Sequence, residues 1–304
     1  MKGLRSIVFF LLLIFLGGCP GKSPFPHPDG AYAYEQAQRL SRIVPRHAGS
    51  EGAERAAELL RKTISDSFPR FRVETDTFRD RTPEGEMTFR NVWAVLPGKS
   101  REFLVIGAHY DAKKLEGVPE FQGANDGGSG VGVLLAMMKA LSDSGVRPGL
   151  ELRFVFFDGE EARIGYTGGD GLHGSRRSVA ELERTGERKN CRAMILLDMV
   201  GDRDLKLKLP PDTDPALRET IRQAAEDLGY GSHLSVEGPA ILDDHTPFVE
   251  AGIPAANLID FEYGPNNLYW HTAADTVEQL SAESLGISAA IALKTIWKLT
   301  GMEP

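Results

Sequence analysis

The chain has 304 residues, 41% of them hydrophobic and 26% charged, and a formal net charge of −8 at pH 7. An acidic chain without a basic cluster excludes nucleic acid as an expected partner. Its length suffices for a large hydrophobic core and is typical of one α/β domain.

The first 18 residues have the pattern of an export signal. Lys2 and Arg5 supply positive charge, and the apolar run at 7–16 is too short to span a bilayer comfortably. The sequence Leu-Gly-Gly-Cys at 16–19 resembles a bacterial lipoprotein cleavage box. We therefore expect an exported, membrane-anchored lipoprotein with its lipid on Cys19, on the periplasmic or cell-surface side. An ordinary secretory signal is the alternative.

Loss of residues 1–18 would change the formal net charge from −8 to −10, because two basic residues and no acids leave. The proline-rich residues 19–30 predict an extended tether ahead of a single catalytic domain at 31–304. Pro20, not Asp, follows the predicted lipidated cysteine, so the outer membrane is the expected destination. Cys191, the second of two cysteines, is expected in the core and not in a disulfide.

Helical spacing of apolar residues predicts helices at 31–42 and 52–64, the second with Ser50 as its N-cap. Alternation predicts a strand at 71–78, and another at 91–96 ends before Pro-Gly. The remaining predicted elements are buried strands at 103–108, 152–157, 193–197 and 254–259, and helices at 131–141, 215–228, 247–251 and 282–299. Buried strands that alternate with helices predict a three-layer α/β/α domain with a largely parallel sheet.

Side chains that bind metals follow the apolar strands. They are His109 and Asp111 after 103–108, Asp126 in GANDGGSG, Glu160 and Glu161 after 152–157, Asp198 at the end of LLD, and His271 in YWHTAAD. A single such residue is more often a helix cap or a satisfied polar group. The carboxyl ends of parallel strands share one edge of a sheet, where ligands bind. A set in this shared location predicts a zinc site.

The stretch FVFFDGEEA places two carboxylates side by side at such a strand end. Adjacent side chains of an extended segment point in different directions. One can bind the metal while the other faces the substrate as a base. We assign Glu161 as the ligand and Glu160 as the proton carrier, although the chemistry of the pair does not fix this order.

Six motifs occur in the order GAHYD, GANDGGSG, FFDGEEA, LLDMVGD, DDHTPF and WHTAADT. In this order they resemble the zinc-dependent exopeptidases of the aminopeptidase and glutaminyl cyclase superfamily. The resemblance extends from about Pro45 to the last predicted helix. It implies a mixed central sheet flanked by helices, with Glu160 as the acid/base and Glu161 as a ligand.

The resemblance implies two alternative chemistries with the same side chains. An aminopeptidase would hold two zinc ions, one through His109 and Asp198 and one through Glu161 and His271, with Asp126 as the bridge. Water would then cleave the first peptide bond. A glutaminyl cyclase would hold one zinc through Asp126, Glu161 and His271. There the amine of an N-terminal glutamine attacks its own side-chain amide, and ammonia leaves.

Neighbouring residues resemble the cyclases in part. Trp270 precedes His271 as it does in the cyclases, and we expect its indole to form a flat wall of the substrate pocket. Asp243 begins a cyclase-like Asp-Asp-His, which implies a proton network of Asp243 and Asp198 with the base. Simple core packing of Trp270 is the alternative.

Other positions depart from the animal cyclases. GANDGGSG is closer to the aminopeptidases. Tyr166, a further expected substrate contact, replaces a Trp, and Asn257 replaces a pocket His. Asp111 is expected to orient His109, and Asp244 to cap the helix at 247–251 or to match the cyclases. His47 is a lesser candidate near the site, and His173 is expected at the surface.

The sequence as a whole predicts an exported zinc enzyme that acts on the free N-terminus of peptides or proteins. Glutaminyl cyclisation is the leading interpretation, and di-zinc aminopeptidase action is the alternative. A third interpretation is a non-catalytic binding protein on the same scaffold. The retention of all candidate ligands disfavours that one.

Overall fold

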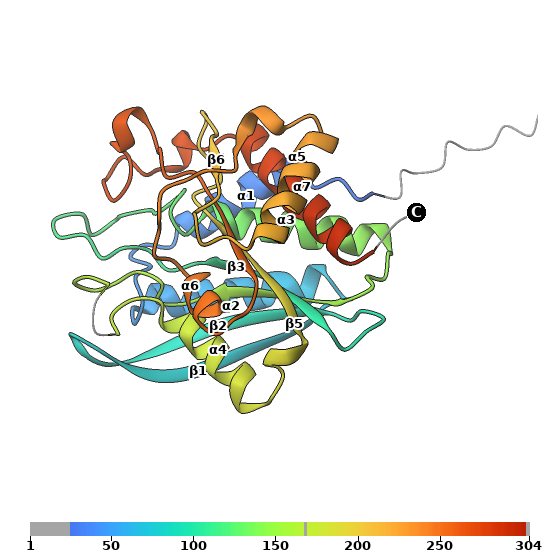
Figure 1. Cartoon of the computed structure of the whole chain (residues 1–304). Helices are drawn as coiled ribbons and strands as arrows, with labels where there is room; N and C mark the ends of the chain where they lie inside the picture. The colour runs from blue at the N-terminus through green and yellow to red at the C-terminus, as the bar shows by residue number, and fades with distance from the viewer. Residues whose placement is uncertain (1–24, 167–168, 302–304) are drawn as a thin grey trace, which may run out of the picture.

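The computed structural model describes residues 25–166 and 169–301 (Figure 1). The predicted signal, the predicted lipidation site Cys19 and the first part of the predicted tether lie outside the described residues. Among the helices of the described ranges, none combines the length and apolar character that a membrane span requires.

An eight-stranded sheet forms the middle layer, in the order β1-β2-β4-β3-β5-β8-β6-β7. The four central strands β4, β3, β5 and β8 are parallel, whereas β1, β2 and β6 pair with a neighbour in the antiparallel sense. The strands are β1 Arg72–Thr82, β2 Gly85–Leu96, β3 Phe103–His109, β4 Glu151–Phe157, β5 Cys191–Asp198, β6 Leu207–Lys208, β7 Leu234–Ser235 and β8 Ala255–Ile259. The prediction of a mixed, largely parallel sheet is confirmed.

Helices cover both faces of this sheet. The α-helices are α1 Gly30–Ser41, α2 Glu51–Ser67, α3 Ser129–Ser144, α4 His173–Arg184, α5 Pro215–Asp227, α6 Thr246–Glu250 and α7 Ala282–Leu299. Four short 3₁₀ helices are η1 Arg188–Asn190, η2 Gly231–His233, η3 Pro265–Asn267 and η4 Val277–Gln279. Helices α2, α3, α5 and α7 pack on one face, with α1 outside them on α3 and α7, while α4 and α6 cover the other.

The central strands are buried on both faces, which explains their uninterrupted apolar sequences. In β3, Leu104 and Ile106 belong to the core under α3 and α7. Phe103 and Val105 belong to the smaller core under α4 and α6. Successive side chains of a strand alternate between faces, so a strand between two helical layers has no polar face.

The first hairpin is longer than predicted. Strands β1 and β2 pair from Arg72 with Val95 to Thr82 with Gly85. The outer half of this hairpin is largely exposed and charged. It therefore lacks the apolar signal on which the prediction at 91–96 depended. The predicted N-cap of α2 is confirmed, because Ser50 Oγ accepts a hydrogen bond from the backbone N–H of Ala53 at 3.1 Å.

Helix α4 was absent from the predicted elements. Besides His173, it buries only small residues and two larger apolar side chains, Val179 and Leu182, so its apolar pattern is weak. His173 at its start was expected at the surface, and this prediction is wrong. Its ring is buried, stacks on Phe89 with centroids 4.4 Å apart, and places Nδ1 2.7 Å from Asp80 Oδ2.

Two further predictions concern Cys191 and the residue at which the packed domain begins. Cys191 is buried in β5, as predicted, and burial raises the pKa of its thiol to about 12. Phe25, in the last part of the predicted tether, packs edge-to-face on Trp297 of α7, with centroids 5.6 Å apart. Asp29 then caps α1 by accepting from the backbone N–H of Ala31. The packed part of the chain therefore begins before residue 31.

Candidate metal centre

The candidate ligands converge at the carboxyl edge of the parallel strands. His109 and Asp198 are the last residues of β3 and β5, and Asp126 precedes α3. Glu161 follows β4, and His271 lies in the long loop after β8. Parallel strands end at the same edge of a sheet, so these distant segments meet there. The candidate Asp111 also lies at this edge. The backbone N–H of its neighbour Tyr110 donates to the carbonyl of Phe157, the last residue of β4, at 3.0 Å.

Two groups of three side chains could each hold one cation. His109, Asp126 and Asp198 form one group, and Asp126, Glu161 and His271 form the other, with all ligand atoms of a group within 4.8 Å of one another. His109 Nε2 is 3.2 Å from Asp198 Oδ1 and 3.3 Å from Asp126 Oδ1. His271 Nε2 is 3.1 Å from Asp126 Oδ2 and 3.0 Å from Glu161 Oε1. Asp126 thus faces a different imidazole with each oxygen.

The donor set fits zinc, which takes imidazole nitrogen and carboxylate oxygen. Asp126 Oδ2 is buried and has no well-directed hydrogen bond within the described residues. A cation between it and His271 would satisfy this oxygen. The backbone at His271 has φ of 52°, and Met199, directly after Asp198, has φ of 49°. Such values are uncommon outside glycine and cluster at functional sites.

The electrostatics of the cluster favour bound positive charge. Burial alone would lower the pKa of His271, but its contacts with Asp126 and Glu161 outweigh burial and raise that pKa to about 10. Burial, and then the charge of Glu161, raise the pKa of Glu160 well above its ordinary value. A divalent cation would supply the same compensating charge and keep nearby carboxylates ionised.

Glu160 lies in this cluster without belonging to either ligand group. The Tyr166 hydroxyl is 3.0 Å from both carboxylate oxygens of Glu160 and 3.4 Å from Glu161 Oε2. Lys113 Nζ donates to the Ala162 carbonyl at 2.8 Å and lies 3.2 Å from Glu161 Oε2. Lys113 was not among the predicted site residues, although it follows GAHYD by two positions.

Asp111 holds the segment that carries the two glutamates. Its oxygens accept hydrogen bonds from the backbone N–H groups of Glu160 at 3.1 Å and Glu161 at 3.3 Å. The expected contact with His109 is longer, with Asp111 Oδ1 3.6 Å from His109 Nδ1. Asp111 therefore positions the Glu-Glu backbone first, and the imidazole only through a longer ion-pair contact.

A second buried carboxylate positions Asp126. Asp275, the last residue of WHTAAD, accepts hydrogen bonds from the backbone N–H groups of Asn125 at 2.8 Å and Asp126 at 3.2 Å. The Tyr263 hydroxyl also donates to it, at 2.7 Å. The motif that supplies His271 therefore also fixes Asp126.

Arg46, and not its neighbour His47, connects the PRHAGSEG loop to the centre. The guanidinium is buried and donates to the carbonyls of Tyr110 at 2.7 Å, Gly123 at 2.9 Å and Leu40 at 3.3 Å. Tyr110 and Gly123 flank two segments that carry candidate ligands. His47 contacts Arg163 instead, with Nδ1 3.2 Å from Nη1. His47 was the lesser candidate of this loop, and Arg46 was not considered, because an arginine is rarely buried.

We expect Arg46→Lys to lower the free energy of unfolding by roughly 3 kcal/mol, because a lysine cannot reproduce the fork and loses charge-assisted hydrogen bonds worth about 1.5–3 kcal/mol each. Urea unfolding of the metal-loaded protein measures the change. Arg39→Lys is the matched control, since Arg39 makes one side-chain contact, to Gln36. Equal stability of the two variants would contradict the bridging role of Arg46.

The predicted network of Asp243 is partly built by Asn257. The buried Asn257 Nδ2 donates to Asp243 Oδ2 at 2.7 Å, so Asn257 holds Asp243 and is not among the side chains that line the cavity. Burial, and then the charge of Asp198, raise the pKa of Asp243 to about 7. Asp244 does not cap α6, which begins at Thr246 without a side-chain cap. That alternative is wrong.

A cavity of about 270 Å³ opens onto the centre. Asp126, Glu160, Glu161, Asp198, Asp243 and His271 give it a charged wall, and the apolar part of its lining includes Met199, Ile241, Ile259, Phe261 and Trp270. The Trp270 indole stacks on the His271 imidazole, with centroids 4.2 Å apart and 21° between the planes. Trp270 and Tyr166, the two expected substrate contacts, both lie in this lining.

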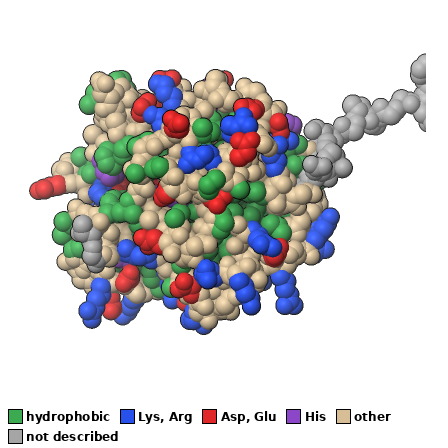
Figure 2. All heavy atoms as spheres, in the orientation of Figure 1, with side chains coloured by type: hydrophobic (Ala, Val, Ile, Leu, Met, Phe, Trp, Pro, Cys, Tyr) green, Lys and Arg blue, Asp and Glu red, His purple; other side chains and the backbone are tan. Residues whose placement is uncertain are grey.

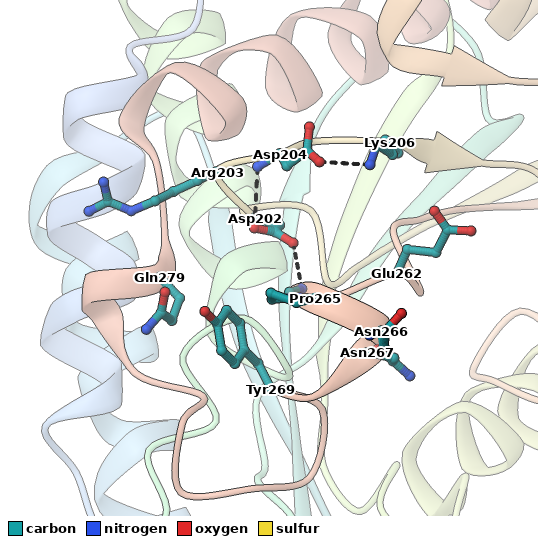
Figure 3. Close-up of a pocket in the computed structure, with 11 residues that line it drawn as sticks. Asp202, Arg203, Asp204, Lys206, Glu262, Pro265, Asn266, Asn267, Tyr269 and Gln279 are labelled. Carbon is teal, nitrogen blue, oxygen red and sulfur yellow. Dashed lines mark hydrogen bonds and ion pairs between the residues drawn. The ribbon is translucent and has the colours of Figure 1, made fainter.

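A second pocket of about 600 Å³ is lined by Gln279 and by residues of two segments, 202–206 and 262–269 (Figure 3). Asp202 joins these two segments, because it accepts a hydrogen bond from the backbone N–H of Gly264 at 3.0 Å. Within its own segment it also accepts one from the backbone N–H of Asp204, at 3.3 Å. In the described ranges, neither group of candidate ligands includes a residue of this pocket. Asp202 anchors the loop at Gly264, a few residues before Trp270.

Comparisons with known proteins agree with this geometry. The family model described as Peptidase family M28 matches residues 91–296. The chain is 29% identical over 279 residues to a glutaminyl-peptide cyclotransferase of Bos taurus, covering 80% of this chain and 75% of that protein. It is 34% identical over 194 residues to aminopeptidase YwaD of Bacillus subtilis, covering 62% and 39%. The crystal structure of an Acidobacteriales bacterium glutaminyl cyclase superimposes with a TM-score of 0.86 at 31% identity, covering 94% and 99%.

Proposed function

Because this chain belongs to peptidase family M28, we propose that it is a zinc-dependent glutaminyl-peptide cyclotransferase, which converts an N-terminal glutamine of a peptide or protein to pyroglutamate and releases ammonia. The observation that carries the proposal is the Trp270 indole, which stacks on the candidate ligand His271 in the same cavity as Glu160. The similarity to a bacterial glutaminyl cyclase along nearly the whole chain supports it.

Asp126, Glu161 and His271 would hold one zinc ion in this enzyme, because these three donors face one another beside the cavity. When bound, zinc polarises the side-chain amide carbonyl of the substrate as a Lewis acid. Asp111 accepts a hydrogen bond from the backbone N–H of Glu161, and Asp275 accepts one from the backbone N–H of Asp126. The ligand geometry is thus fixed by the chain itself.

The remaining steps belong to the chain's own residues. Trp270 and Phe261 offer an apolar surface to the methylene groups of the glutamine side chain. The α-amine forms the new bond to the side-chain carbonyl carbon, and Glu160 accepts the proton that the amine loses. Glu160 then returns this proton to the departing amide nitrogen, the carbon–nitrogen bond breaks, and ammonia leaves. No water is consumed.

A second candidate function, aminopeptidase action, is favoured by one observation. His109, Asp126 and Asp198 form a second ligand group that shares Asp126 with the first. A site of this kind suits two metal ions and hydrolysis of the first peptide bond. In a one-zinc cyclase, His109 and Asp198 would instead stay paired with each other, with His109 Nε2 3.2 Å from Asp198 Oδ1.

Activity measurements on two substrates distinguish the two functions. The protein from Pro24 onward is loaded with zinc and offered a Gln-initiated peptide and a Leu-initiated chromogenic amide. We expect ammonia and a pyroglutamyl product from the first and no cleavage of the second. Leucine release from the second substrate with no ammonia from the first would overturn the cyclase proposal in favour of the aminopeptidase.

A further inference from the structure

The large apolar side chains that are most exposed in the described residues all lie in loops around the metal centre. Ile164 is 79% exposed, Leu268 63% and Leu242 47%. Ile164 follows the Glu-Glu pair by three positions, and Leu268 precedes His271 by three. Leu242 directly precedes Asp243. Figure 2 shows hydrophobic side chains spread over this face of the molecule, including its left side, where Figure 1 places the loops after β4 and β8.

The loop before Asp243 is apolar as well as exposed. Residues 239–242 have the sequence Pro-Ala-Ile-Leu, and all four line the cavity. Pro239, Ala240 and Leu242 are exposed in addition. Surface loops are normally polar, and contiguous exposed apolar residues mark binding sites. These side chains therefore lie both on the cavity wall and at its mouth. Ile164 and Leu268 do not line the cavity themselves, but each lies two positions from a residue that does, Tyr166 and Trp270. Ile164, Pro239, Ala240, Leu242 and Leu268 are called the apolar rim below.

We propose that the apolar rim binds the second and third residues of the substrate and makes the enzyme prefer large apolar side chains there. This inference rests on the proposed function. An N-terminal glutamine that places its side chain at Glu161 and Trp270 fills the cavity, so the next residues of the chain leave through its mouth. The rim continues directly from the cavity lining at Leu242, and a peptide is the occupant that this continuity favours.

The expected size of the preference follows from the apolar surface area that the second side chain of the substrate would bury on the rim. Burial of about 50 Å² of apolar surface on the rim corresponds to about a tenfold gain in kcat/KM. A serine at the second position of the substrate gains little from such contact. We therefore expect Gln-Leu-Gly-amide to react about ten times more efficiently than Gln-Ser-Gly-amide.

Glutamine amide, which has no second residue, separates this inference from the proposed function. Ammonia release from glutamine amide and from both peptides establishes cyclisation. A Leu-over-Ser ratio near ten in the wild type, which falls to about two or less in the double variant Leu242→Ser/Leu268→Ser, supports the rim. Leu299→Ser, a half-buried apolar position at the end of α7, is the control, and its ratio is expected to stay near ten.

Four outcomes would overturn the inference. Equal kcat/KM of the wild type on the two peptides would show that the apolar rim sets no preference at the second position, while the cyclase function stands. An unchanged ratio in the double variant would place the preference elsewhere. Binding of the zinc-loaded protein from Pro24 onward to phosphatidylglycerol vesicles, lost in the double variant, together with no dependence on the second residue, would assign the rim to a lipid surface. Failure of glutamine amide and both peptides to react would remove the proposed function as well.

Discussion

Replacement of Glu160 by Gln is expected to lower kcat by about a thousandfold while the zinc content stays unchanged. Positioned proton transfer contributes about 10²–10⁴-fold to the rate, and the amide of glutamine cannot accept the proton of the attacking amine. Glu160 contributes no atom to either ligand group, so the metal should remain bound. Steady-state ammonia release and elemental analysis of the same sample measure the two quantities.

The control for this variant is Glu151→Gln, at the start of the same strand β4. Glu151 forms an ion pair with Arg153 far along the strand from the centre, and its variant is expected to keep wild-type turnover. A Glu160→Gln protein that keeps more than about a tenth of wild-type kcat would show that another group carries the proton. Loss of zinc from this variant would instead make Glu160 a ligand and reverse the order of the Glu-Glu pair.

Replacement of His271 by Gln is expected to remove zinc from the protein, whereas His109→Gln is expected to keep one zinc per chain. In the one-zinc arrangement His271 is one of three ligands, and its loss should weaken zinc binding by more than the roughly 10–100-fold that loss of an outer hydrogen-bond partner causes. His109 belongs only to the second ligand group. Zinc per chain after dialysis against a weak chelator measures the difference.

His233→Gln is the matched control, because His233 is half-buried, belongs to neither ligand group, and among the described residues has only a long polar contact to the Leu205 carbonyl, at 3.4 Å, and an edge-on contact with Tyr230. It should bind zinc like the wild type. Two zinc ions per wild-type chain, with one lost in His109→Gln, would contradict the one-zinc arrangement and favour the aminopeptidase. Circular dichroism and thermal unfolding of all three variants show whether a loss of zinc follows from a loss of fold.

Several side chains at the centre were missed because their roles depend on partners that are distant in sequence. Arg46 acts through carbonyls at Tyr110 and Gly123, 64 and 77 positions away. Asp275 acts through the backbone N–H groups of Asn125 and Asp126, 150 and 149 positions away. Neither has an unusual residue type or spacing around it that would indicate such a contact.

The expectations for the elements failed where the apolar pattern is weak. Helix α4 rests on the sheet largely through glycine, serine and histidine, and Gly174 leaves room for the Asn91 side chain and the Asp158 backbone. The outer half of the first hairpin is held largely by backbone pairing, with Phe78 and Phe89 as a stacked cross-strand pair. Hydrophobic periodicity reports burial, and these segments bury few large side chains.

The amino-acid sequence by itself determined the layered fold, the strand ends that carry metal-binding side chains, and the chemical kind of the site. It did so because a strand between two helical layers must be apolar throughout, so polar residues at its end are conspicuous. The tertiary structure alone decided that each oxygen of Asp126 lies beside a different imidazole, that Arg46 and Asp275 hold the ligand loops, and that Leu242 lines the cavity at the metal centre. These are contacts between loops far apart in the chain, set by how the layers pack, and no local pattern of residues encodes them.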